Sequence, residues 1–397
     1  MRALSILFVA MLVCTVITAQ QALSGGQEII SPEIHANNTV TFRLRAPEAT
    51  KVEITGDFLP TQKRQTSRGE FEGPGVEALT KNENGLWEYT TPTPLTPELY
   101  NYSMIVNGVT IVDPNNPYMI RDIASVTSIF IIGGGRADLY KVNDVPHGTV
   151  ARRWYDSPTL GLTRRITIYT PPGYEASNTQ YPVFYLLHGA GGDEEAWIAL
   201  GRSTQILDNL IAQGKAKPMI VVMTNGNAGQ KAAPGESERG MYKPSFMGDT
   251  RMDGAFEEAF PDVMKFVESN YRTINTKAGR AIAGLSMGGF HSFHISKEYP
   301  DKFDYVGLFS AAIMAREGVT SKIYSNLDEK LKTQFAQKPK LYYIAIGSAD
   351  FLIQANRDLC KKLDDNKFQY TFYETGEGHI WKNWRIYLTE FTPLLFK

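Results

Sequence analysis

Ser286 stands at the centre of a pentapeptide whose pattern is typical of a serine nucleophile. Residues 284–288 read G-L-S-M-G, which fits the pattern G-x-S-x-G. The short apolar stretch 281–283 predicts a strand before the serine, and residues 289–299 predict a helix that ends at Pro300. A serine at such a sharp turn presents its hydroxyl outside the sheet, and glycines are needed where the backbone is crowded. The sequence therefore predicts a nucleophile elbow at Ser286.

His379 is the histidine best placed to serve as the base that such a serine needs. A serine hydroxyl is a weak nucleophile at neutral pH unless a neighbouring base takes its proton. When an elbow of this kind carries a triad, the order along the chain is Ser, then Asp or Glu, then His. Only His379 follows Ser286 at a sufficient distance, in a glycine-rich loop after the strand-like run 368–373. His291 and His294 lie on the predicted helix after the serine, and we interpret them as packing or surface residues.

Asp350 is predicted to be the acid that orients this base. It closely follows the β-prone run 341–346, which is typical of a parallel strand buried on both faces. The other acidic candidates lie on a later helix-like segment or very near the histidine: Asp358, Asp364, Asp365, Glu374 and Glu377. The predicted triad is therefore Ser286, Asp350 and His379.

Two backbone N–H groups should bind the oxyanion that forms during acyl transfer. Met287, directly after the serine, is predicted to supply one. The strand-like run 182–187 ends in the sequence H-G-A-G-G, in which Ala190 is predicted to supply the other and Gly191 is the near alternative. A plain glycine turn is the competing interpretation of this loop.

The region from about Val150 to the C-terminus resembles carbohydrate esterase family 1, the esterase-D-like α/β-hydrolases that include feruloyl esterases and acetyl xylan esterases. The resemblance rests on Y-T-P-P-G-Y at 169–174, Y-L-L-H-G at 185–189 with Trp197, G-L-S-M-G-G at 284–289, and Gly378 and His379 followed by Trp381 and Trp384. It implies the same triad as the residues do. Because antigen-85 type mycolyltransferases and thioesterase-like proteins share this family shape, the resemblance does not select a substrate.

Three tryptophans are predicted to approach the site from two directions. Trp197 follows the oxyanion loop, and Trp381 and Trp384 follow His379. A phenolic acyl group could stack on such rings and gain about 0.5–1.5 kcal/mol beyond burial. In the alternative interpretation, Trp381 and Trp384 begin the last helix and pack it on the sheet. With an appended β-domain, the family resemblance favours feruloyl over acetyl groups.

Residues 24–135 predict a different architecture. Short alternating segments separated by Pro and Gly predict an all-β, immunoglobulin-like sandwich. The segments 53–58 and 112–117 resemble the family 48 carbohydrate-binding module. Trp87, Tyr100 and Tyr102 are interpreted as core residues, with stacking on a sugar ring as the alternative.

The predicted fold class is α/β, with a domain of this sandwich type before an α/β-hydrolase domain at 150–397. The latter should contain a mostly parallel sheet with helices on both faces. Glycines 133–135 and the polar stretch 141–144, which lies within a linker at 136–149, are predicted to form a hinge between two independent cores. The predicted helix over 255–271 should begin near Pro261. The polar segment 225–250 is interpreted as a pocket wall or lid, with a surface excursion as the alternative.

Residues 1–19 are predicted to be a signal peptide, with a positive start, an apolar stretch at 4–17 and cleavage before Gln20. The apolar stretch is too short for a comfortable membrane span. The residue before Cys14 is larger than a lipoprotein signal normally carries, which disfavours lipidation. If Cys14 is removed with the signal, Cys360 remains alone and no intrachain disulfide can form.

The composition and motifs narrow the function further. The chain has 397 residues and a formal net charge of −1, which gives no reason to expect nucleic acid as a partner. The sequence shows no metal-ligand spacing and no dinucleotide-binding or phosphate-binding motif, so no cofactor is expected.

We expect a secreted or periplasmic serine carboxylic-ester hydrolase that removes feruloyl or acetyl groups from plant cell-wall xylan. The alternatives are an acyltransferase of the antigen-85 type and a non-catalytic glycan-binding protein. The expected partner is an esterified plant polysaccharide or oligosaccharide, without membrane insertion after signal removal.

Overall fold

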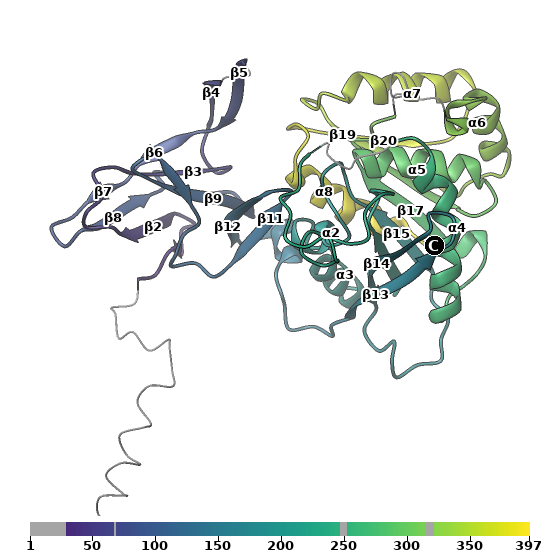
Figure 1. Ribbon diagram of the computed structural model, residues 1–397, viewed down its shortest axis with the longest axis horizontal. Coiled ribbons are helices and arrows are strands. Elements are labelled where there is room, and N and C mark those ends of the chain that lie inside the picture. Colours follow the sequence, from purple (N-terminus) through teal and green to yellow (C-terminus); the bar gives the residue numbers. More distant parts are fainter. Residues whose placement is uncertain (1–28, 67–68, 247–251, 314–320) are drawn as a thin grey trace, which may run out of the picture.

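The computed structural model of the chain describes residues 29–66, 69–246, 252–313 and 321–397. It has two parts: antiparallel strands near the N-terminus and a larger part in which helices cover a sheet (Figure 1). The predicted signal peptide, residues 1–19, lies outside the described residues.

The N-terminal part is a sandwich of antiparallel sheets, as its alternating segments predict. One sheet has the order β1-β2-β8-β7, and the other has the order β11-β12-β9-β3-β6 with β10 paired to β9. A separate hairpin pairs β4 with β5. The strands are β1 (Glu33–Ile34), β2 (Val40–Arg45), β3 (Val52–Gly56), β4 (Thr61–Thr66), β5 (Gly69–Pro74), β6 (Val76–Ala78), β7 (Thr80–Lys81), β8 (Leu86–Thr90), β9 (Glu98–Val106), β10 (Val109–Ile111), β11 (Met119–Asp122) and β12 (Ser125–Ile132).

The two sheets of this sandwich share an apolar core. The ring of Phe42 on β2 lies 4.9 Å from that of Tyr102 on β9 and 5.5 Å from that of Phe130 on β12, centroid to centroid. Trp87 and Tyr100 belong to the same core, and both are buried, as is Tyr102. The interpretation of these aromatic side chains as core residues is therefore confirmed.

The C-terminal part is built on one eight-stranded sheet with the order β13-β14-β16-β15-β17-β18-β19-β20. β13, β14 and β16 pair antiparallel, and the six strands from β16 to β20 in this order run parallel. Every residue of β15, β17 and β18 is buried, as expected for parallel strands covered on both faces. The strands are β13 (Thr149–Ser157), β14 (Leu162–Thr170), β15 (Val183–Leu187), β16 (Ile220–Thr224), β17 (Arg280–Leu285), β18 (Tyr305–Phe309), β19 (Leu341–Gly347) and β20 (Thr371–Thr375).

Helices cover both faces of this sheet. Side chains of α2, α3 and α8 pack with Ala281 and Ala283 of β17 in one apolar core. Side chains of α4, α5, α6 and α7 pack with Ile282 in a second core. Because successive side chains of a strand point to opposite faces, these cores lie on the two sides of the sheet. The helices are α2 (Ala196–Ala199), α3 (Ser203–Ala212), α4 (Ala255–Asn270), α5 (Met287–Glu298), α6 (Leu327–Ala336), α7 (Ile353–Asp365) and α8 (Trp381–Phe391), with short 3-10 helices at Gly135–Tyr140, Lys277–Gly279, Lys322–Tyr324 and Thr392–Leu394.

Helix α4 runs through Pro261, so the prediction that the helix begins near this proline is wrong. A proline has no N–H, and the carbonyl of Glu257, four residues earlier, therefore loses its usual partner. The hydroxyl of Tyr299, directly after α5, donates to this carbonyl at 3.3 Å. A neighbouring segment thus replaces the missing donor, and the helix keeps its first turns.

The sandwich packs directly on the α/β part. Its strands β9, β11 and β12 reach toward α2 and α3 (Figure 1), and Leu99, Ile120 and Ile129 of these strands join the core that contains α8. Tyr140, at the end of the 3-10 helix that follows β12, is fully buried in the same core. The prediction of a hinge between two independent cores is therefore wrong, because apolar residues at the ends of the strands continue the core of the α/β part.

Candidate active site

Ser286 lies at the turn between β17 and α5, in a backbone conformation that residues other than glycine rarely adopt. Its φ is 52° and its ψ is −113°. Its N–H donates to the carbonyl of Phe309 at 2.9 Å, and its carbonyl accepts from the N–H groups of Phe290 and Ala312, each at 3.0 Å. These bonds to β18, its exit and α5 hold the strained turn in place. Strain of this kind persists only where the surrounding structure fixes it, and it is common at functional sites.

Two glycines make room for this turn. A Cβ atom on Gly284 would lie 2.5 Å from the carbonyl oxygen of Gly288. A Cβ atom on Gly288 would lie 2.6 Å from the carbonyl oxygen of His188. Any side chain at either position would therefore collide with backbone, which explains the two glycines of the pentapeptide.

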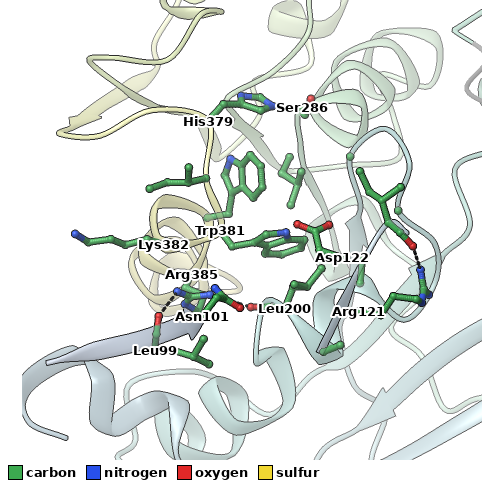
Figure 2. A pocket seen from close by; sticks show the side chains of 18 of the residues that line it. Leu99, Asn101, Arg121, Asp122, Leu200, Ser286, His379, Trp381, Lys382 and Arg385 are labelled. Atoms are coloured by element: carbon green, nitrogen blue, oxygen red, sulfur yellow. Dashed lines mark hydrogen bonds between the residues drawn. The ribbon is translucent and has the colours of Figure 1, made fainter. Parts of the chain in front are cut away.

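His379 and Asp350 are hydrogen-bonded to each other near the carboxyl ends of β19 and β20. The distance between His379 Nδ1 and Asp350 Oδ2 is 2.9 Å. Burial alone would raise the pKa of Asp350, but the hydrogen bond and charge of His379, together with the N–H of Leu352, hold that pKa below its ordinary value. A carboxylate therefore faces Nδ1, and Nε2 remains free to face the cavity. In Figure 2 the imidazole of His379 points toward Ser286.

Ser310, directly after β18, supports this pair and was not predicted from the sequence. It is fully buried, and its hydrogen bond to Asp350 also lowers the pKa of that carboxyl. Its hydroxyl accepts a hydrogen bond from Trp384 Nε1 at 3.1 Å. The ring of Trp384 lies edge to face with His379, with 4.9 Å between the centroids. The only sequence signal for Ser310 is its position at the end of a buried strand.

The loop after β15 lies against Ser286, where the predicted oxyanion donors should be. A Cβ atom on Gly189 would lie 3.3 Å from the Cβ of Ser286. Neither the N–H of Ala190 nor that of Met287 donates to an acceptor in the part of the chain that the structure describes. Met287 begins α5, whose first N–H groups lack partners within the helix and whose dipole favours negative charge at this end. Both N–H groups are thus available to an oxyanion, and their role remains a prediction.

His188 fixes the conformation of this loop. Its Nε2 accepts the N–H of Gly226 at 2.8 Å, so Nδ1 carries the proton and donates to the carbonyl of Gly189 at 2.7 Å. Burial lowers the pKa of His188 to about 4. The imidazole is therefore neutral at physiological pH and acts as a positioning group. No role for His188 was predicted from the sequence.

Ser286 and His379 line a cavity of about 600 Å³ whose walls come from both parts of the molecule. This volume lies within the roughly 300–1,000 Å³ that is typical of small-molecule sites. Figure 2 shows the serine and histidine at one end and Asn101 of β9 and Asp122 of β11 away from them, with Trp381 next to Asp122. That the sandwich lines the cavity was not predicted from the sequence.

The three tryptophans differ in their positions. Trp381 and Trp384 line the cavity. Trp197 is only 1% exposed and does not line it; its Nε1 donates to the carbonyl of Leu187 at 2.9 Å. Its ring lies edge to face with that of Trp381, at 5.3 Å between centroids. The prediction of a substrate contact for Trp197 is therefore wrong. This buried side chain binds the carbonyl of the last residue of β15 and packs against Trp381 from the core.

The segment after β16 contributes to the wall of the cavity through Phe246. Its first part is held by Arg164, which donates to the carbonyl oxygens of Asn225 and Asn227 at 2.6 and 2.9 Å. The described part, up to Phe246, therefore agrees with the interpretation of this segment as a pocket wall. The last residues of the predicted segment, 247–250, lie outside the described residues.

The following two absences concern only residues 29–66, 69–246, 252–313 and 321–397. Within them, no three His, Cys, Asp or Glu side chains gather in a way that could hold a metal ion. None of the helices within the same residues is long and apolar enough to cross a membrane.

The chain resembles known esterases over most of its length. The Esterase family model matches residues 157–395, which is more than half of the chain. An endo-1,4-beta-xylanase/feruloyl esterase of Xylanibacter ruminicola is 29% identical over 382 residues, covering 94% of this chain and 46% of the relative. The chain thus spans less than half of that relative's length.

Solved structures share the fold. A ferulic acid esterase from Anaeromyces mucronatus superposes with a TM-score of 0.52 at 24% identity, covering 64% of this chain and 93% of the other. The enterobactin esterase of Shigella flexneri gives a TM-score of 0.59 at 16% identity and covers 90% of this chain and 93% of its own. At these identities the likeness concerns the fold alone, and in the second case it extends over nearly the whole chain.

Proposed function

Because the chain belongs to the Esterase family, we propose that it is a serine carboxylic-ester hydrolase with Ser286, His379 and Asp350 as its catalytic triad. The observation that carries the proposal is the strained turn at Ser286, which shares a cavity with a histidine hydrogen-bonded to a buried carboxylate. A nucleophile, a base and a group that orients the base are the parts that acyl transfer needs.

In the proposed mechanism, Ser286 attacks the ester carbonyl while Nε2 of His379 takes the proton of its hydroxyl. The N–H groups of Met287 and Ala190 bind the oxyanion of the tetrahedral intermediate. His379 then returns the proton to the leaving alcohol, and the acyl-enzyme forms. A water molecule activated by the same imidazole hydrolyses the acyl-enzyme, and Asp350 keeps the imidazole in the required tautomer throughout.

The proposed substrates are feruloyl esters, or acetyl esters, of plant cell-wall xylan. Two observations support the feruloyl choice. The relative from Xylanibacter ruminicola carries feruloyl esterase in its name. Trp381 and Trp384 line the cavity that holds Ser286, and aromatic rings favour contact with a phenolic ring.

Acyl transfer to a sugar acceptor is the main alternative, since it uses the same residues up to the acyl-enzyme. A non-catalytic glycan-binding role is a further alternative, which the arrangement of Ser286, Asp350 and His379 disfavours.

We also propose that residues 1–19 direct the chain to secretion or the periplasm. A carbohydrate-binding role of the sandwich stays a proposal that rests on its resemblance to family 48 modules.

Hydrolysis of p-nitrophenyl acetate and methyl ferulate, each with and without a sugar acceptor, tests the proposal. We expect release of ferulate at a rate that the acceptor does not change. Formation of an acylated sugar at the expense of free acid would support the transferase. Efficient deacetylation of acetylated xylan without ferulate release would overturn the feruloyl preference and leave the triad untouched.

A further inference from the structure

One carboxylate in the cavity has no hydrogen-bond or ion-pair partner among the residues that the structure describes. Six acidic side chains line the cavity: Asp57, Glu98, Asp122, Asp193, Glu195 and Glu377. Five of them bind a partner. Asp57 binds Asn101, and Glu98 binds Arg385. Asp193 binds Arg121, Glu195 binds Arg152 and Arg165, and Glu377 binds Lys382. Asp122 accepts no hydrogen bond and forms no ion pair with any residue that the structure describes. Its carboxylate is therefore free to bind a ligand.

The cations of the cavity are already neutralised, which makes an anionic ligand group unsuitable there. Arg121, Lys382 and Arg385 are the basic side chains in its lining, and each is paired with an acidic residue. Asp122 thus adds a negative charge that only a hydrogen-bond donor or a cation from the ligand can satisfy.

The backbone turn that carries Asp122 is held firmly, although the exposed Asp122 lies on the sandwich. Asp122 pairs with Ser125 across the turn between β11 and β12. The preceding Arg121 binds the buried Asp193 of the α/β part at 2.5 Å and the carbonyl of Ile123 at 2.9 Å. A Cβ atom on Gly191 would lie 2.9 Å from Cδ1 of Ile123, so this turn also rests on the predicted oxyanion loop. A turn fixed in this way can present a carboxylate to a ligand with little reorganisation of the backbone on binding.

The arrangement of groups in the cavity matches the arrangement of groups in one class of acyl chain. In Figure 2, Trp381 and Asp122 both lie away from Ser286 and His379, with the Trp381 side chain next to the carboxylate of Asp122. A 4-hydroxycinnamoyl group has the ester carbonyl at one end, an aromatic ring in the middle and a phenolic hydroxyl at the other end. With its carbonyl at Ser286, its ring would contact Trp381 and its hydroxyl would approach Asp122.

We propose that Asp122 accepts a hydrogen bond from the phenolic hydroxyl of the acyl group, so that the sandwich takes part in substrate selection. This inference rests on the proposed feruloyl esterase function and deepens it, because it assigns a specificity-determining residue to the N-terminal part. The turn between β11 and β12 is then a wall of the acyl site.

The test compares kcat/KM for methyl 4-hydroxycinnamate, methyl cinnamate and p-nitrophenyl acetate in the full chain. We expect the wild type to prefer the hydroxylated ester over methyl cinnamate by roughly 10- to 100-fold, the usual value of a hydrogen bond to a charged group. Asp122→Ala should abolish this preference by lowering kcat/KM for the hydroxylated ester alone. Asp122→Asn, which keeps an acceptor oxygen, should restore part of it. Glu77→Gln, on the exposed face of β6 in the same sandwich, is the matched control and should change none of the three values.

Each contrary outcome has a distinct meaning. Equal turnover of the two cinnamoyl esters by the wild type would overturn the role of Asp122 and leave the esterase function intact. Turnover of p-nitrophenyl acetate alone would overturn the feruloyl function and, with it, this inference. An equal loss on all three esters in Asp122→Ala would also overturn the proposed contact with the phenolic hydroxyl.

Discussion

Arg385 on α8 forms a buried ion pair with Glu98 on β9, and this pair joins the sandwich to the helix that follows His379. The distance between Arg385 Nη2 and Glu98 Oε1 is 3.0 Å, and the two side chains are 1% and 7% exposed. The guanidinium also donates to the carbonyl oxygens of Leu200 and Leu99, at 3.1 and 3.2 Å. Because α8 begins with Trp381, the pair fixes the sandwich relative to one wall of the cavity.

We predict that Glu98→Gln destabilises the whole molecule, because it leaves the charge of Arg385 buried without an opposite charge. Breaking a buried pair by removing one member typically costs about 3–5 kcal/mol. The change is measured as the free energy of unfolding in urea. Glu390→Gln is the matched control, since Glu390 lies on the same helix and pairs with Arg136 at the surface. An exposed pair contributes about 0–1 kcal/mol, so equal effects of the two substitutions would contradict the prediction.

Removal of the sandwich should inactivate the enzyme, even toward a small ester. A chain that begins near Asp144 would lack Asn101 and Asp122 from the cavity wall and would expose the apolar surface that Leu99 and Ile129 cover. We expect such a chain to aggregate or to unfold at a much lower temperature than the full chain. A well-folded truncated protein with full turnover of p-nitrophenyl acetate would show that the α/β part is independent.

Ser286→Ala should abolish ester hydrolysis and leave the fold intact. Loss of one triad member typically lowers kcat by several orders of magnitude, because these residues act as a unit. Thermal unfolding of the variant should match that of the wild type. Residual turnover close to that of the wild type would remove Ser286 from the mechanism.

Ser286→Gly should also be inactive but more stable than Ser286→Ala. The φ of 52° at this position is strained for alanine and is readily adopted by glycine. Relief of strain of this kind contributes about 1–3 kcal/mol, from which the greater freedom of glycine in the unfolded chain subtracts roughly 0.5–1 kcal/mol. Urea unfolding of the two inactive variants compares them directly, and a less stable glycine variant would argue against strain at the elbow.

The sequence was sufficient to predict the parallel sheet and the pentapeptide turn, because both depend on local patterns. Apolar runs such as 341–346 indicate buried strands, and a glycine-flanked serine between a strand and a helix indicates an elbow. The start of β20 differs from the prediction: the run 368–373 predicts a strand, whereas β20 begins at Thr371. Phe368 instead stacks on Phe335 with 4.3 Å between the ring centroids, a contact between distant segments that no local pattern contains.

The contribution of the sandwich to the cavity could not be predicted for the same reason. Arg121 and Asp122 are two adjacent polar residues at the end of a short strand, and nothing near them in the sequence indicates Asp193 or Ser286. Their place in the cavity follows from how two parts of the chain pack. Trp197 shows the converse: it follows a functional loop in sequence, yet its indole is needed in the core.

The last prediction concerns Asp350, which should affect both catalysis and the response of stability to pH. Asp350→Asn keeps the size of the side chain but removes the charge that orients His379, and we expect kcat to fall by roughly 10³–10⁴-fold. Asp358→Asn, on the exposed side of α7, is the matched control and should retain full turnover.

The folded protein holds the pKa of Asp350 below its unfolded value of 3.8. The carboxylate therefore stabilises the fold above that value, and this contribution is lost as the pH falls through the lower, folded pKa. Accordingly, the free energy of unfolding of the wild type should fall relative to that of Asp350→Asn as the pH is lowered from about 6 toward 3. A difference that stays constant over this range would show that His379 does not stabilise the charged form of Asp350.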